Sequence, residues 1–593
     1  MTFAPQKEEA VGTINNIVSR SIVQRVYNDG DNTYLTIQQE SRNSLPIVST
    51  ASTLIVPLTN PNVDFVQFDK SFIRLHATVT LNLSGYAAAI ASSTTVTNAD
   101  GTTITIASDA DTITKGIYLF IGLKNSSDFI SEYAIYHKGK QISGTLQSNA
   151  TVESFLYHSS RSAFDTQNRK GIHSVAEKVA ERDDTSYVGH YVSLYELQQA
   201  AATAAKTYDV DLNIDIPFND VLIFQQFQTY PSALFGDLEI RFKVNPNALV
   251  CLQCNPYSTL RHRNIELQHA ATITNLMNTY ATEAVNYTRD YTQLGDSFVA
   301  ITHAANTAYV DMSTENSTTD LTTKAIAKFL DKMERLQFAT QSVSLSYNTI
   351  ALDQCYATII GYRAKPDSLE KMRQKFEKLP FVKFSQNINY LQFASKPTTN
   401  INMTQQIYLN NTTDMILLFP TTSHEAGGTV YKNPMLQNLS LTAMNRKFPE
   451  TGFDTTSPEY LHIQLNSTRG TPQKEVADSL STKRWDTQGK YNPPFDRTSF
   501  FTAFKVERPT AMGLICDGLD SKGYQVPIRL MAQPKYATAN DLYCYRSENT
   551  SALPPPILIT VNDSYFIFNS KDGGQCIYSN RPFNETVATF MSQ

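Results

Sequence analysis

The chain has 593 residues and a formal net charge of −5, and only 18% of its side chains are charged, against roughly 25% in an average soluble protein. This composition argues against binding of nucleic acid through the overall charge of the protein, because phosphate binding needs clustered Lys and Arg. A local basic patch is still compatible with the sequence. The surface is instead rich in Thr, Asn, Ser, Gln and Tyr, which suits contacts between copies of one chain. The length predicts roughly two to four domains.

Six dispersed cysteines are too few for a disulfide scaffold in a chain of this length, so reduced thiols are expected. The start, MTFAPQKEEAVGTINN, lacks the apolar core of a secretory signal, and no stretch approaches the roughly 18 apolar residues of a membrane span. We therefore expect a chain that is made and kept in an intracellular compartment.

Residues 1–48 are polar and show only a weak helical pattern. Val11, Ile14, Val18 and Ile22 recur at intervals of three or four residues. We predict an N-terminal arm, which either docks on a neighbouring copy or packs on its own domain as a terminal segment.

Residues 49–247 are predicted to form a first β-domain. Its clearest strand is FDKSFIRLHATVTLNL, residues 68–83, in which two sets alternate: Ile73, Leu75, Ala77, Val79, Leu81 and Leu83 against Arg74, His76, Thr78, Thr80 and Asn82. Period-two alternation predicts one buried and one exposed face, with His76 at the surface or in an interface. Further strands are predicted at 116–124, 131–142, 208–218 and 236–244, and the long loops between strands fit a sandwich.

Residues 248–338 change character, and we predict a helical connector or insertion there. The stretches 261–285 and 322–338 both have helical spacing, and packing against a sheet explains their apolar stripes better than a partner groove does. Strands resume in residues 339–593, which we predict to be a second β-domain, with one helix at PDSLEKMRQKFEKLP.

Cys251 and Cys254 are separated by two residues, the spacing that places two thiolates on one zinc ion, and His262 and His269 follow. The full pattern, Cys-x2-Cys-x7-His-x6-His, matches none of the common structural zinc sites. Two buried thiols acting as small apolar side chains are the favoured interpretation, and zinc binding is the alternative.

The stretch DVDLNID places oxygen ligands at Asp209, Asp211, Asn213 and Asp215. A calcium loop of the EF-hand type needs Gly at its sixth position and Glu at its twelfth, where this chain has Ile214 and Asp220. An exposed acidic strand face is therefore predicted, and a cation held between subunits is the alternative.

The sequence has no GxxxxGK[ST], HExxH or GxSxG motif and no strand-linked GxGxxG. The carboxylate pairs Asp183 with Asp184 and Asp109 with Asp111 lie in Ser/Thr-rich loop sequence, where a solvated loop explains them better than acid–base catalysis. We expect a protein that is not an enzyme, and we name no catalytic, cofactor-binding or metal-binding residue.

Four segments in order resemble the double jelly-roll major capsid proteins, especially those of virophages and of Polinton (Maverick)-like viruses. VDFVQFDKSFIRLHATVTLNL resembles their first long strand, and ISEYAIYHKGKQISGTLQSNATVESFLYHSSRS resembles a strand with an Asn-Gly-Lys turn, where this chain has His137, Lys138 and Gly139. ALFGDLEIRFKVNPNALVCL is similar to the closing strand of a first roll. Residues 433–465 are similar to a strand followed by a turn, with Asn445, Phe448 and Pro449 at the turn positions, and the final strands of residues 539–568 also resemble the family.

The resemblance implies an all-β double jelly roll, in which each half is an eight-stranded sandwich. It implies a major capsid protein whose trimers form pseudo-hexagonal capsomers that tile an icosahedral shell. The partners would be the chain itself, neighbouring capsomers, and penton and minor capsid proteins, with no specific nucleic acid. The expected location is the virion, assembled inside the host cell.

Two other functions fit the sequence. A carbohydrate-binding or carbohydrate-cleaving β-sandwich would use the 31 tyrosines, although the single Trp, Trp485, argues against it. A minor capsid or spike protein would share the sandwich but occur in few copies per particle.

Overall fold

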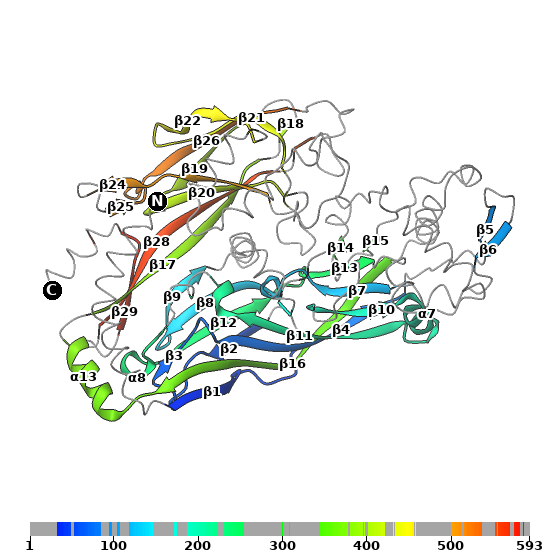
Figure 1. The fold of residues 1–593 in the computed structure, drawn as a ribbon, viewed down its shortest axis with the longest axis horizontal. Helices are drawn as coiled ribbons and strands as arrows, with labels where there is room; N and C mark the ends of the chain where they lie inside the picture. Colours follow the sequence, from blue (N-terminus) through cyan, green and yellow to red (C-terminus); the bar gives the residue numbers. More distant parts are fainter. Residues whose placement is uncertain are drawn as a thin grey trace.

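The fold is described from a computed structural model (Figure 1), which covers two sets of strands and the helix that joins them. The described residues are 33–48, 52–84, 94–97, 103–106, 118–145, 187–221, 229–253, 344–377, 380–394, 401–420, 433–455, 500–510, 515–535, 555–569 and 575–581, with short pieces between them.

Strand β4 (Phe72–Asn82) shows how the sequence builds the first sandwich. Its side chains alternate between buried and half-buried along the whole strand, and Ile73, Leu75 and Val79 are at most 1% exposed. The predicted two-faced strand is therefore confirmed. The five predicted inward residues of β4, and Leu83 just after it, belong to one hydrophobic core with the other strands of this half.

The first sandwich consists of two antiparallel layers. One sheet has the order β1-β16-β4-β11, and the other has the order β2-β12-β8-β9, continued by β10-β7-β13. The bounds are β1 Thr33–Glu40, β2 Thr53–Pro57, β7 Tyr118–Leu123, β8 Ile130–His137, β9 Lys140–Thr145, β10 Gly189–Ser193, β11 Thr207–Pro217, β12 Leu238–Val244, β13 Leu249–Gln253 and β16 Ser344–Arg363. Short elements are β3 Phe65–Val66, β5 Thr94–Thr97, β6 Thr103–Ile106, β14 Val299–Ala300, β15 Thr307–Ala308, η2 Ser126–Phe129, α7 Leu194–Ala202, η3 Phe218–Asp220 and α8 Ser232–Phe235.

The second sandwich repeats this plan with the sheets β17-β28-β20-β23 and β19-β26-β21-β22. The bounds are β17 Phe381–Gln392, β19 Ile401–Tyr408, β20 Thr412–Leu418, β21 Leu436–Ala443, β22 Arg446–Phe453, β23 Phe501–Lys505, β26 Gln525–Pro534, β28 Ile557–Asn569 and β29 Gln575–Ser579, which pairs with β28. The short strands are β18 Lys396–Pro397, β24 Arg508–Thr510, β25 Ile515–Asp517 and β27 Ala552–Leu553.

Both sandwiches have the same strand order. When the principal strands of each half are numbered along the chain, one sheet reads first-eighth-third-sixth and the other reads second-seventh-fourth-fifth. In the first half the fourth, fifth and seventh strands are each split into two pieces. This order is that of a jelly roll, in which the chain winds back and forth between two sheets. The chain is a double jelly roll, and the predicted fold class is confirmed.

Strand pairing corrects two predicted domain boundaries. Strand β1 lies within the predicted arm, yet it pairs along its whole length with β16. Strand β16 lies within the predicted second domain, yet it pairs with β4 of the first roll. The first roll therefore begins by Thr33 and ends at Arg363, and the stretch between β13 and β16 interrupts this roll instead of joining the two. The predicted helices at 261–285 and 322–338 lie outside the described residues.

Helix α13 (Pro366–Phe376) confirms the predicted helix and links the two rolls. Proline at its first turn favours helix initiation, and Met372 and Phe376 are buried. In the described part of the chain, no helix is long and apolar enough to cross a membrane.

The same hairpin of each roll, between its fourth and fifth strands, turns in two residues with positive φ. These residues are Lys138 (48°) and Gly139 (78°) between β8 and β9, and Met444 (49°) and Asn445 (61°) between β21 and β22. Two consecutive positive φ values define the tight turn whose twist matches that of antiparallel strands, and Asn and Gly adopt it most readily.

Candidate functional site

The two rolls meet through a cluster of aromatic side chains. Phe235 of α8 lies 5.0 Å from Phe381 of β17, 5.4 Å from Phe376 of α13 and 5.5 Å from Phe568 of β28, measured between ring centroids. All four side chains are at most 3% exposed. Strand β29 also lies against β9. Burying a large apolar side chain stabilises by about 1.5–3 kcal/mol, so this cluster fixes the second roll against the first.

His137 is the polar member of this junction, and it is buried. Its Nε2 lies 2.8 Å from the carbonyl oxygen of Phe235, to which the neutral ring donates. Removal from water lowers the pKa of His137 below its ordinary value, and the nearby positive charge of Lys138 lowers it further. The hydrogen bond to Phe235 and the negative charge of Asp237 act in the opposite direction but are outweighed. The junction therefore holds this imidazole in its uncharged form.

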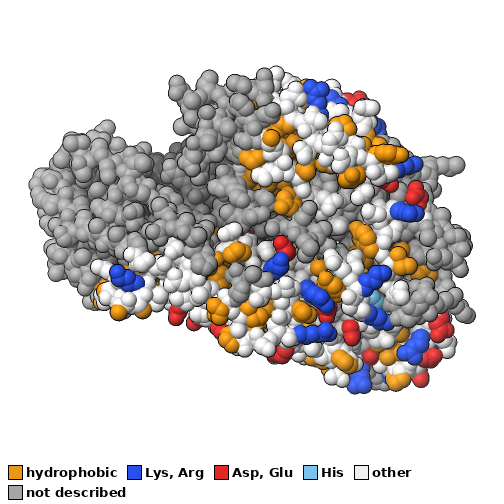
Figure 2. Space-filling model, turned by 180° about the vertical axis from the view of Figure 1, so that it is seen from behind, with side chains coloured by type: hydrophobic (Ala, Val, Ile, Leu, Met, Phe, Trp, Pro, Cys, Tyr) orange, Lys and Arg blue, Asp and Glu red, His pale blue; other side chains and the backbone are white. Residues whose placement is uncertain are grey.

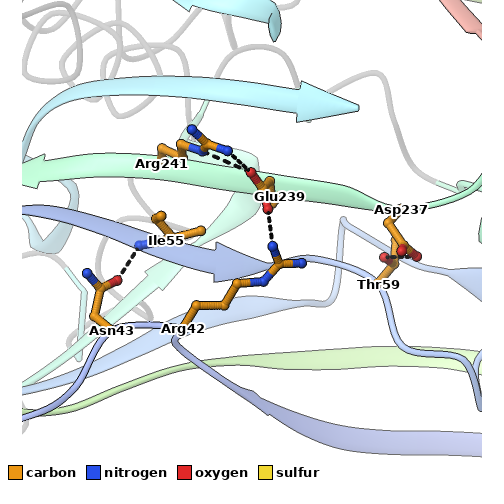
Figure 3. Close-up of polar contacts among 7 residues, drawn as sticks. All are labelled: Arg42, Asn43, Ile55, Thr59, Asp237, Glu239 and Arg241. Atoms are coloured by element: carbon orange, nitrogen blue, oxygen red, sulfur yellow. Dashed lines mark hydrogen bonds and ion pairs between the residues drawn. The ribbon is translucent and has the colours of Figure 1, made fainter. Parts of the chain in front are cut away.

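A charged group lies on the outer side of β2 and β12 (Figure 3). Glu239 accepts a hydrogen bond from Nε of Arg241 at 2.8 Å and lies 3.0 Å from an amino group of Arg42. The Arg241 guanidinium also stacks on the ring of Tyr136, 3.9 Å from its centroid. Glu239 is only 7% exposed, because the two guanidinium groups cover it and neutralise its charge.

The segment that follows β1 is attached to the edge of β2. The side-chain oxygen of Asn43 accepts a hydrogen bond from the backbone N–H of Ile55 at 2.7 Å (Figure 3). The amide nitrogen of Asn43 donates to the carbonyl of Thr53 at 3.0 Å. Asn43 thereby imitates a further strand and satisfies the open edge of the sheet. Together with the Arg42 contact, this makes residues 41–48 a part of the first roll.

The outer side of β11, β4 and β16 is the acidic face predicted from DVDLNID. We call Asp209, Asp211, Asp215 and Asp353 the acidic face. Asp215 forms two hydrogen bonds of 2.6 Å with Arg74, and Asp209 accepts from the hydroxyl of Thr80 at 2.7 Å. The cross-strand register places these partners directly opposite each other.

Two carboxylates of the acidic face share one hydroxyl. Thr78 Oγ1 lies 2.9 Å from Asp211 and 3.1 Å from Asp353, and it has a single proton to donate. His76 Nδ1 lies 3.4 Å from Asp353. In the described part of the chain, Asp211 has no cationic partner, so negative charge remains available on this face.

The second roll presents a different outer surface, which we call the β19–β26 face. Its members are outward residues of β19 and β26, and one residue of β22, which lies beyond β21 in the same sheet: Asn402, Thr404, Gln406, Tyr408, Gln525, Pro527, Arg529, Met531 and Lys447. Tyr408 and Met531 are 53% and 38% exposed, and the turn before β26 adds Tyr524 at 75%. Arg529 donates to Asn402 at 3.0 Å and has no carboxylate partner among the described residues. The alternation in QVPIRLMAQP was sufficient to place Arg529 and Met531 outward, although sequence reasoning did not single them out.

Of the other predicted candidates, the structure describes only Cys251. Cys251 is buried in β13, and burial raises the pKa of its thiol to about 12, which disfavours the thiolate that zinc requires. Cys254, His262 and His269 lie outside the described residues, as do the carboxylate pairs at 109–111 and 183–184. Within the described ranges, no group of three or more His, Cys, Asp or Glu is arranged to hold a metal ion.

Solved structures of viral capsid proteins align with nearly the whole chain. The capsid of PBCV-1 aligns over 93% of this chain and 97% of its own, with 10% identity and a TM-score of 0.41. The mavirus major capsid protein aligns over 92% and 90%, with 7% identity and a TM-score of 0.41. The Sputnik virophage structure aligns over 92% and 88%, with 10% identity and a TM-score of 0.40. The strand order, and not these scores, defines the fold.

No family model matches the sequence, and no curated protein matches it.

Proposed function

We propose that the chain is a major capsid protein, which self-assembles into trimers that tile the shell of an icosahedral virus particle. The observation that carries the proposal is the presence of two rolls of identical strand order in one chain, fixed to each other by a buried aromatic junction. Three such subunits around an axis present six similar rolls, which is the shape needed to pack in a hexagonal layer.

The distribution of polar groups supports a protein that works by association. The hydrophobic side chains of each roll pack between its own two sheets, and the described outer faces carry hydroxyls and amides together with charged groups of both signs. In this proposal the chain acts as a structural subunit and not as a catalyst. Its neighbours in the virion are further copies of itself, with penton and minor capsid proteins at the vertices and beneath the shell.

Purified protein analysed by size-exclusion chromatography with light scattering tests the proposal. We expect a species of three subunits, each of 66.3 kDa, and electron microscopy should show pseudo-hexagonal blocks or closed shells. A monomer at all concentrations tested would contradict it. Specific binding on a glycan array, with no particles formed, would favour the carbohydrate-binding alternative.

A further inference from the structure

We propose that the β19–β26 face of one copy binds the acidic face of the next copy, so that each subunit joins its neighbour through two different surfaces. This contact rests on the proposed function and names the surfaces through which it operates. Its partner is a second copy of this chain, and the mode is head-to-tail, which closes into a ring when the rotation between copies divides a full turn.

The repeated strand order supplies the first argument. Within the chain, the junction joins β8 and β9 of the first roll to β28 and β29 of the second. The sheet β2-β12-β8-β9 of the first roll thus meets the sheet β17-β28-β20-β23 of the second roll. The first of these contains the second, seventh, fourth and fifth strands of its roll, and the other contains the first, eighth, third and sixth. Among the described residues, the sheets that meet no other sheet across their outer faces are β1-β16-β4-β11 in the first roll and β19-β26-β21-β22 in the second. These two sheets would form the same combination if two copies met.

The positions of these two sheets supply the second argument. In Figure 1 the sheet with β1 and β16 lies on the lower side of the first roll, and β19, β26, β21 and β22 lie on the upper side of the second. Strands β8, β9, β17 and β28 occupy the space between them. The two outer faces point away from each other within one subunit, so only a second copy brings them together.

Charge and apolar surface supply the third argument. Arg529 on β26 and Lys447 on β22 lie on the two strands that flank β21, each opposite Thr442, and β19 and β26 contain no Asp or Glu. On the opposing surface, Asp209 and Asp211 have only Thr hydroxyls as side-chain partners in the described part of the chain. Opposite charges at such a contact set orientation and partner choice.

The exposed side chains of the β19–β26 face are of the kind that interfaces bury. Tyr and Met are enriched in interfaces and isolated Lys is depleted, and Tyr408 and Met531 lie on either side of Arg529. Figure 2 shows hydrophobic side chains exposed over the upper part of the molecule, where the second roll lies, and over the first roll below it, with Lys and Arg among them. A partner with matching acidic groups removes this surface from water.

The test uses charge reversal on the full chain. Arg529→Glu with Lys447→Glu makes one face acidic, and Asp209→Lys with Asp211→Lys makes the other basic. Each pair should weaken association by about tenfold or more, because like charges then face each other. All four substitutions together restore opposite charges and should recover association. Lys371→Glu with Arg373→Glu on exposed positions of α13 changes net charge equally and should have no effect.

Sedimentation separates the outcomes, with circular dichroism to check folding. Weakening by each pair and recovery in the combined variant supports the contact. Association unchanged by either reversal overturns this contact but leaves the capsid proposal intact. A wild-type chain that never associates overturns both.

A second measurement does not depend on any variant. A carbodiimide reagent joins a Lys amine to a carboxylate in direct contact, and mixing isotope-labelled with unlabelled chains identifies links between copies. We expect Lys447 to be linked to Asp209 or Asp211 of another copy. Links between copies that join Lys447 only to other carboxylates would overturn the contact.

Discussion

The imidazole of His137 in the first roll lies edge-on against the phenyl ring of Phe568 in the second, with ring centroids 5.3 Å apart and planes at 78°. The same Phe568 ring contacts Tyr230, Phe235 and Phe381. The side chain of Phe568 is therefore surrounded by aromatic groups of the first roll and by Phe381 of β17, the first strand after α13.

Replacement of Phe568 with Ala should loosen the junction. Loss of a fully buried phenyl group costs about 3–5 kcal/mol, and here the loss falls on the contact between the rolls. We expect calorimetry to show the rolls unfolding in separate transitions. Tyr524→Ala, at a side chain that is 75% exposed, serves as the control and should change stability by less than about 0.5 kcal/mol. One undisturbed transition in Phe568→Ala would contradict this view of the junction.

Acid should weaken the junction through His137. Burial lowers the pKa of this residue in the folded chain, so below pH ~6.5 the unfolded chain binds a proton that the folded chain does not. The free energy of unfolding should therefore fall as pH decreases from 7 to 5. His137→Gln has an amide donor for the Phe235 carbonyl and no titration in this range, so its unfolding should depend less on pH. An identical pH dependence in both proteins would exclude His137 as the cause.

The alternation of β4 predicts opposite results at adjacent residues. Val79 is fully buried, so Val79→Asp places a carboxylate in the core and should prevent folding. Thr78 lies on the outer side, so Thr78→Asp should give a soluble, folded subunit, with any loss confined to assembly. Circular dichroism and solubility distinguish the two. Equal damage from both substitutions would contradict the two-faced assignment.

The β21–β22 turn offers a test of backbone conformation. Asn445 has φ 61°, which costs a residue such as Ala about 1 kcal/mol more than Asn or Gly. Asn445→Ala should lower the free energy of unfolding by about this amount, whereas Asn445→Gly should leave it nearly unchanged. Chemical denaturation measures both. A similar loss in the two variants would instead indicate that the Asn side chain is the stabilising group.

The local strands of this fold could be predicted from the sequence, because each depends on its own alternation. β4, β11 and β12 alternate clearly, and their outward residues, including Asp209 and Asp211, lie where the pattern places them. The acidic face followed from the same pattern.

The assignment of strands to rolls could not be predicted in this way. β1 is paired with β16, which lies far away in sequence, and only the order of the complete roll specifies that partner. The contact of Arg42 with Glu239 depends on the same long-range pairing, so neither residue stood out. Periodicity indicates that a strand has two faces, but it contains no information on its neighbour.

The eighth strand of each roll has a consequence for synthesis. β16 inserts between β1 and β4, and the backbone N–H of Ala364, just beyond it, donates to the carboxylate of Asp64 across 300 residues of sequence. A nascent chain therefore exposes the open edges of β1 and β4 until the ribosome has made this last strand. Pairing between strands so distant in sequence is slow. The first roll therefore has to be protected from aggregation through its open edges until β16 has paired with β1 and β4. The time at which a subunit first becomes able to assemble is thus set by the arrival of β16 and later of β28.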